Sequence, residues 1–165
     1  MPIPPKPEPA ADPSQIASRR YARERVMQTL YASFMAESDF NFLCHEIILN
    51  DAKLDETSKT FAFSLAKKAH EEMETTEAMI AAKSAHWDVS RLAAIDRAIL
   101  HMAITELKFF RDIPPKVTID EAIEIAKRFS TAESGRFVNG ILDAVLSDLK
   151  SEGGLTKRGR GLRES

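Results

Sequence analysis

Four arginines within seven residues near the start of the chain are the strongest candidates for binding chemistry: Arg19, Arg20, Arg23 and Arg25. A guanidinium fork matches phosphate oxygens, so this cluster favours contact with an RNA backbone. Arg23 stands one helical turn after Arg19 and one turn before Met27, so the core-facing stripe becomes cationic toward its N-terminus. We expect that stripe to leave the core. On spacing alone, a solvated helix start explains these charges equally well.

Arg136 and Phe137 form a second candidate for RNA contact. An aromatic ring beside a cation can stack a base while the cation holds a phosphate. Phe137 is also in line with Ile141 and Val145 at helical spacing, and this periodicity alone favours core packing. Both interpretations remain open on the residues alone.

Tyr31 and Asp96 are candidates for contact with a protein partner. Tyr31 offers a flat apolar ring with a polar tip, which suits an interface, and the alternative is a position at the core edge. Asp96 directly follows Ile95, so we expect its carboxylate to point away from the core stripe. The alternative for Asp96 is an ion pair with Arg97 or Lys67.

The sequence shows no pattern of catalysis or metal binding. His45-Glu46 and His70-Glu71 begin like zinc-protease helices, but each lacks the second histidine four residues on. There is no phosphate-binding glycine loop and no nucleophile signature, so we expect no enzyme, no cofactor and no metal. The four histidines are expected at surface or boundary positions, and the single cysteine, Cys44, is expected to be buried.

Length and composition predict one soluble domain. A chain of 165 residues with 44% hydrophobic and 29% charged residues fits a single globular core, and no apolar stretch reaches the roughly 20 residues of a membrane helix. Without a signal peptide in the proline-rich start, we expect a cytoplasmic protein. The net charge of −2 means that any nucleic-acid surface must be a local patch.

The elements that must position these residues are all helical, since no segment shows strand alternation. Helices are predicted from about 16 to 36, from 40 to 50, along one long apolar repeat from 61 to 80, from 92 to the stop at Ile113-Pro114-Pro115, and from 131 to 150. Between the last two, a capping box of Thr118 and Glu121 predicts a helix that ends near Phe129. Gly140 inside the last helix indicates close packing against a neighbour.

The two ends of the chain are expected to lie outside the folded domain of residues 15–150. Residues 1–14 carry most of the prolines and predict a disordered leader, and residues 151–165 predict a flexible basic tail after Gly153-Gly154.

Two consecutive motifs resemble the NusB family of bacterial transcription antitermination factors. Residues 114–129 reproduce the family's P-x-K-V-x-I-x-E-A-I-E-x-A-K-x-F stretch, and residues 136–143 reproduce its K/R-F-V-N-G-x-L-D. The arginine-rich first helix and the segment Ile95-Asp96-Arg97-Ala98-Ile99-Leu100 extend the resemblance to about residues 18–148. It implies a compact all-α domain of six to seven helices in two three-helix subdomains.

The resemblance also implies a function without catalysis. Members of the family bind boxA-like single-stranded RNA together with ribosomal protein NusE, within the RNA polymerase antitermination complex, during transcription of ribosomal RNA operons. The matching positions place Glu133 and Phe137 at the RNA surface and turn Tyr31 and Asp96 toward NusE. This chain departs from the family at His101, where arginine is usual, and at Thr105, where tyrosine is usual.

Two other functions remain open on the sequence. The same fold serves as the RNA-recruiting N-terminal domain of bacterial ribosomal-RNA cytosine methyltransferases, although 165 residues leave no room for a cofactor domain. A divergent bundle that binds only proteins is the third. The sequence does not distinguish a monomer from a homodimer that hides its RNA face.

Overall fold

The structure is a computed structural model that describes residues 13–84 and 92–153. Its helices follow in the order α1 (Pro13–Met35), α2 (Phe40–Cys44), the π-helical turn η1 (His45–Leu49), α3 (Glu56–Glu71), α4 (Met73–Lys83), α5 (Ala94–Phe109), α6 (Pro115–Phe129) and α7 (Ala132–Ser151). No strand occurs within these two ranges, and the predicted all-α class is confirmed. In the same ranges, no helix is both long and apolar enough to cross a bilayer.

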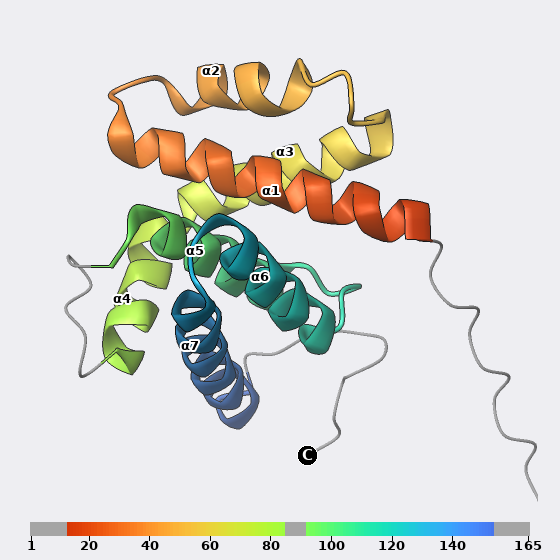
Figure 1. Cartoon of the computed structure of the whole chain (residues 1–165). Coiled ribbons are helices and arrows are strands. Elements are labelled where there is room, and N and C mark those ends of the chain that lie inside the picture. The colour runs from red at the N-terminus through yellow and green to blue at the C-terminus, as the bar shows by residue number, and fades with distance from the viewer. Residues whose placement is uncertain (1–12, 85–91, 154–165) are drawn as a thin grey trace, which may run out of the picture.

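The helices form two groups, which meet where α1 packs against α5. In Figure 1, α1 crosses the molecule with α2 above it and α4 to α7 below it. The first group consists of α1, the α2–η1 segment and α3, and the second of α5, α6 and α7, with α4 against α5 and α7. This arrangement agrees with the predicted pair of three-helix subdomains.

The centre of the core is α5, whose residues are buried without interruption from Ala98 to Leu107. A helix that is buried on every side lies inside the protein rather than along its surface. It contacts α1, α3, α4, α6 and α7. The polar side chains in this stretch, His101, Thr105 and Glu106, must therefore find their partners inside the protein.

The predicted stop after α5 is confirmed, but the predicted capping box is wrong. Helix α6 begins at Pro115, with Pro114 as its N-cap, because a proline at the first helical position gives up no needed hydrogen bond. Thr118 lies one turn inside the helix, is buried, and donates to Glu106 Oε1 at 2.8 Å. Glu121 accepts from Arg20 on α1 instead of capping its own helix.

The long helix predicted over residues 61–80 is two helices. At Glu72 the backbone leaves the helical region (φ −95°, ψ 9°), and α4 continues in a new direction that packs it on α5 and α7. Thr76 and Ile80 remain buried after the bend, so their helical spacing continues across it. Periodicity alone could not reveal the break.

Three further predictions concern the ends of the chain, Cys44 and Gly140. Helix α1 begins at Pro13, two residues before the predicted domain, and the rest of the predicted leader and tail, residues 1–12 and 154–165, lie outside the described residues. Cys44 is buried as expected, and burial raises the pKa of its thiol to about 11. The packing predicted at Gly140 is wrong, since this glycine is exposed and a Cβ there would meet nothing within 4 Å.

Candidate RNA and partner surface

Arg23 lies in the core, contrary to the expectation that the cationic stripe leaves it. The residue is 4% exposed, and its guanidinium donates two hydrogen bonds to Glu106, at 2.9 and 2.7 Å. Thr118 donates to the same carboxylate, so the buried charge has partners from α1 and α6. Bidentate geometry is what a buried ion pair needs to offset its lost hydration. Arg23 is therefore placed to position α1 rather than to touch a phosphate.

Arg20 lies at the surface although it is paired. Its Nε and Nη2 donate to Glu121 at 2.8 and 3.0 Å, and its side chain remains 40% exposed. The hydrogen bond to Glu121 raises the pKa of Arg20. An exposed guanidinium has five N–H donors, and this pair occupies two of the nitrogens, so an edge remains for a phosphate oxygen.

Arg19 is held against an aromatic ring. Its guanidinium carbon lies 4.0 Å from the centroid of Phe61 on α3, and that of Arg23 lies 5.3 Å from the same ring. Burial lowers the pKa of Arg19, and the charge of Arg23 lowers it further. An arginine stays protonated under such shifts. Because Glu106 already pairs with Arg23, the charge of Arg19 is the one beside this ring that is available to an external anion.

Arg25, the fourth arginine of the cluster, is used to fix α1 on the loop after η1. It donates to Asp51 at 2.7 Å, and the Tyr21 hydroxyl donates to the same carboxylate at 2.5 Å. Burial of Asp51 works against its ionisation, but the hydrogen bonds from Tyr21 and Arg25 outweigh it and hold its pKa at about 2. This arginine is structural.

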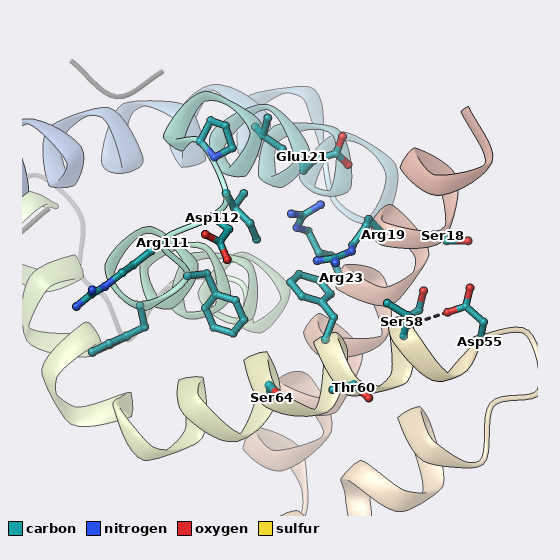
Figure 2. Close-up of a pocket in the computed structure, with 17 residues that line it drawn as sticks. Ser18, Arg19, Arg23, Asp55, Ser58, Thr60, Ser64, Arg111, Asp112 and Glu121 are labelled. Carbon is teal, nitrogen blue, oxygen red and sulfur yellow. Dashed lines mark hydrogen bonds between the residues drawn. The ribbon is translucent and has the colours of Figure 1, made fainter. Parts of the chain in front are cut away.

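A large cavity opens beside Arg19, between α1, α3 and the connection from α5 to α6 (Figure 2). Its volume is about 1260 Å³, and its walls carry the aromatic rings of Phe61, Phe109 and Phe110. Figure 2 shows Arg19 and Arg23 entering it from α1, with Asp112 facing them from the α5–α6 connection. This cavity could not be predicted from the sequence, because its walls come from three segments that are far apart along the chain.

The second RNA candidate begins α7. Glu133 and Arg136 are exposed. Phe137 is half-buried and packs on the core cluster, so one part of its side chain serves the core and another part is open to solvent. Gly135 between them is buried, and a Cβ there would lie 3.2 Å from Cγ of Lys127 on α6. The structure thus places two RNA candidates on α1 and three on α7, and α6 contacts both helices.

The sequence predicted that Asp96 points away from the core, and this prediction is wrong. It is 6% exposed at the start of α5, and its Oδ2 accepts from the Ser134 hydroxyl of α7 at 3.0 Å. Its Oδ1 is buried without a hydrogen-bond partner. Arg97, one of the alternatives, pairs with Glu77 at 3.2 Å instead. Asp96 therefore joins α5 to α7, close to the proposed RNA side chains.

Tyr31 is at the surface, as a partner residue requires. It is 37% exposed, and the next apolar residue one turn along α1, Met35, is 58% exposed. Phe42 on α2 adds another ring at 56% exposure. Exposed aromatic and methionine side chains are enriched at protein interfaces.

His101 is fully buried, so the prediction of surface histidines is wrong at this position. Its ring lies between Thr76 Oγ1 and Glu77 Oε2, at 2.5 Å from each. Burial lowers the pKa of His101, and the charge of Glu77 opposes that shift. The residue holds α4 on α5. Thr105, the other departure from the family, is buried and donates to the His101 carbonyl at 2.7 Å.

The ion pair between Glu106 and Arg23 was not predicted from the sequence. A signal was present, since this carboxylate interrupts the apolar run from Ile99 to Leu107 and a buried carboxylate requires a cation. No group of three or more His, Cys, Asp or Glu side chains suited to a metal occurs in residues 13–84 and 92–153.

Comparison with known proteins agrees with this description. A model of the NusB family matches residues 20–147. The transcription antitermination protein NusB of Salinibacter ruber is 46% identical over 147 residues, which span 89% of this chain and 92% of that protein. The structure of NusB from T. maritima is similar with a TM-score of 0.73 at 38% identity, covering 79% of this chain and 91% of that one. A crystal structure of antitermination factors NusB and NusE in complex with dsRNA has the same fold, with a TM-score of 0.72 at 22% identity over 80% of this chain and 98% of that one. The resemblance seen in the motifs is confirmed, and the chain belongs to the NusB family.

Proposed function

We propose that this protein is a non-enzymatic transcription antitermination factor of the cytosol. It binds boxA-like single-stranded RNA together with ribosomal protein NusE, within the RNA polymerase antitermination complex, and supports transcription of ribosomal RNA operons. The observation that carries this proposal is the pair of cationic surfaces, Arg19 and Arg20 on α1 and Arg136 beside Phe137 on α7, in a chain of the NusB family. The 92% coverage of the Salinibacter ruber protein favours this role over that of a domain cut from a larger methyltransferase.

The exposed cations supply phosphate contacts in this proposal. Arg20 and Arg136 present guanidinium groups to solvent, and Arg19 adds a third at the cavity between α1 and α3. Phe137 supports a base with the exposed part of its ring, and Glu133 lies one turn before it. Arg23 contributes by holding α1 in place through Glu106. Phosphate contacts supply affinity, and the ring adds base contact.

The partner surface is assigned to Tyr31 and Asp96. Tyr31 offers its exposed ring, and the buried Oδ1 of Asp96, which has no hydrogen-bond partner, is the acceptor assigned to NusE. The similar structure that holds NusB with NusE on RNA supports a joint surface. Two weak RNA contacts on one assembly give avidity that neither protein has alone.

Fluorescence anisotropy tests the proposal directly. A labelled boxA-like RNA and a scrambled control are titrated with the full chain, alone and with NusE, at two salt concentrations. We expect NusE to tighten binding of the boxA-like RNA by about tenfold or more, equal to about 1.4 kcal/mol of coupling, and to leave the scramble weak. Equal binding of both RNAs, unaffected by NusE, would refute the proposed function.

Variants assign the surface. Arg136→Gln is expected to lower the slope of log K against log salt by about 0.7, the loss of one single-strand phosphate contact. Lys150→Gln is the matched control, because Lys150 is also exposed and lies at the far end of the same helix. If the two variants bind alike, Arg136 makes no phosphate contact. Tyr31→Ser should weaken NusE association while the fold persists, since the ring is exposed.

A further inference from the structure

The aromatic rings in the walls of the cavity beside Arg19 differ in exposure, since Phe61 belongs to the core while Phe109 is open to solvent. Phe109, the last residue of α5, is 38% exposed at the cavity, and Val117 near it on α6 is 42% exposed. Phe61 and Phe110 meet edge to face, with centroids 5.8 Å apart and planes at 86°, in the cavity's wall. Exposed aromatic faces in a hollow are characteristic of sites that stack the bases of single strands.

Cations lie against these rings. Lys68 Nζ is 4.5 Å and Lys108 Nζ 5.2 Å from the centroid of Phe109, so the exposed ring is flanked from α3 and α5. Lys68 also pairs with Glu72 at 3.6 Å, on the helix surface. On the other side of the cavity, Arg19 is fixed over Phe61. Rings interleaved with cations are the composition of single-strand nucleic-acid grooves, where the rings take bases and the cations take phosphates.

Some of the charged side chains that line the cavity already have partners within the protein, and others are available to a ligand. Three of them are already used: Arg23 by Glu106, Glu121 by Arg20, and Asp55 by the backbone amide of Ser58 that it caps. Arg19, Arg111 and Asp112 remain for a ligand. In Figure 2, Arg111 extends outward from the connection while Asp112 faces the interior. A carboxylate inside accepts from the exocyclic amino group of a base, as aspartate does from cytosine.

Size and position favour a strand over a small molecule. The volume of about 1260 Å³ exceeds the roughly 300–1,000 Å³ of ligand pockets. Arg19 lines the cavity, and the next residue, Arg20, lies on the α6 side of α1. A strand that contacts Arg20 therefore reaches the cavity by crossing a single helix.

We propose that this cavity is a second single-stranded RNA contact, in which unstacked bases enter between Arg19 and Phe109 while Lys68, Lys108 and Arg111 hold the backbone. This inference rests on the proposed RNA-binding function and extends the RNA path from α1 into the cavity between α1, α3 and the α5–α6 connection. A base with an exocyclic amino group is preferred at Asp112. The strand bound here is the part of the RNA that continues beyond the boxA-like segment.

Photocrosslinking locates the strand. The full chain is irradiated with a boxA-like RNA extended by four nucleotides at either end and carrying 4-thiouridine at one extended position at a time, and the crosslinked peptides are identified by mass spectrometry. We expect crosslinks within residues 109–113. Crosslinks confined to the start of α7 would overturn this inference and leave the proposed function intact. If the unextended boxA-like RNA does not bind at all, the proposed function fails and this inference with it.

Affinity measurements give an independent test. Phe109→Leu keeps an apolar side chain but removes the ring, and Lys108→Gln combined with Arg111→Gln removes two cations. Each variant is expected to bind the extended RNA about fivefold or more weakly than the wild type and to bind the unextended RNA equally. Lys150→Gln, away from the cavity, is the control for a lost charge and should change neither.

Two results would contradict the assignment. Equal loss of both RNAs would mean that the variants act through the fold, a possibility that circular dichroism of each variant checks. Unchanged RNA binding with weakened NusE association would make the cavity a protein-docking site.

Discussion

Replacing Arg23 by methionine tests the core that holds α1. The side chains of Arg23 and Glu106 are 5% and 1% exposed, so Arg23→Met leaves a buried carboxylate that still accepts from the Thr118 hydroxyl but has lost its cation. The two lost charge-assisted hydrogen bonds are worth about 1.5–3 kcal/mol each. Breaking a buried ion pair by removing one partner costs about 3–5 kcal/mol, which agrees with that sum. We expect a loss of about 4 kcal/mol, a large part of the roughly 5–15 kcal/mol that stabilises a domain.

The double variant Arg23→Met/Glu106→Gln separates charge from packing. The glutamine amide still accepts from Thr118 but carries no charge, so the cost of an unpaired buried charge disappears. We expect it to be roughly 2 kcal/mol more stable than Arg23→Met alone. Urea denaturation, monitored by far-UV circular dichroism, gives the free energy of unfolding of each variant. The values can be compared if the m-values of the variants are equal.

A free energy of unfolding of Arg23→Met within about 1 kcal/mol of the wild type, or a double variant no more stable than the single one, would show that the Arg23–Glu106 pair does not hold α1 on the core. The same pair of variants decides how Arg23 serves RNA. Should the folded double variant lose as much RNA affinity as Arg136→Gln, Arg23 itself contacts the phosphate. Reversing Arg23 to glutamate would not decide this, because it places two carboxylates together in the core.

Three further predictions concern stability. Gly140→Ala should raise the free energy of unfolding by about 0.5–1 kcal/mol, since the helical position is open, and Gly135→Ala should gain less because its Cβ must displace Lys127; urea denaturation compares the two. The depressed pKa of Asp51 stabilises the fold above the ordinary carboxyl range, and this stabilisation is lost as the pH falls from about 4 toward 2, so Asp51→Asn should flatten the acid limb of stability against pH. The lowered pKa of buried His101 contributes stability that is present above about pH 6.5 and lost below it, so His101→Gln should weaken the pH dependence of unfolding between about pH 7.5 and 5.5, and an unaltered slope would show that His101 does not titrate there.

The sequence was sufficient for what is decided locally. The prolines at 114 and 115 ended one helix and began the next, and the apolar spacing of α1 and α7 located both to within three residues at each end. The sequence left Tyr31 open between an interface and the core edge, and the structure shows it exposed. The break between α3 and α4 at Glu72 could not be predicted, because the helical spacing of apolar residues continues through the bend.

The sequence was insufficient wherever a side chain's partner lies far along the chain. Arg23 and Glu106 are separated by 83 residues, and Asp96 and Ser134 by 38, so neither contact can be deduced from helical periodicity. A charged residue beside an apolar stripe is usually solvated, and that general rule failed for Arg23 and Asp96 because a partner helix covers them. The same distance effect hid the cavity, whose rings come from α3 and the end of α5.

The ion pairs of α1 bear on how the chain folds as it leaves the ribosome. This helix is made before α5 and α6, which carry Glu106 and Glu121, the partners of Arg23 and Arg20. Glu24 likewise pairs with Arg128, which is 104 residues later. Contacts of such sequence separation form late and slow the folding of a helical protein. During synthesis Arg23 thus remains without its carboxylate until α5 has emerged, and Arg20 until α6 has emerged, so α1 becomes fixed in register only after these later helices have folded.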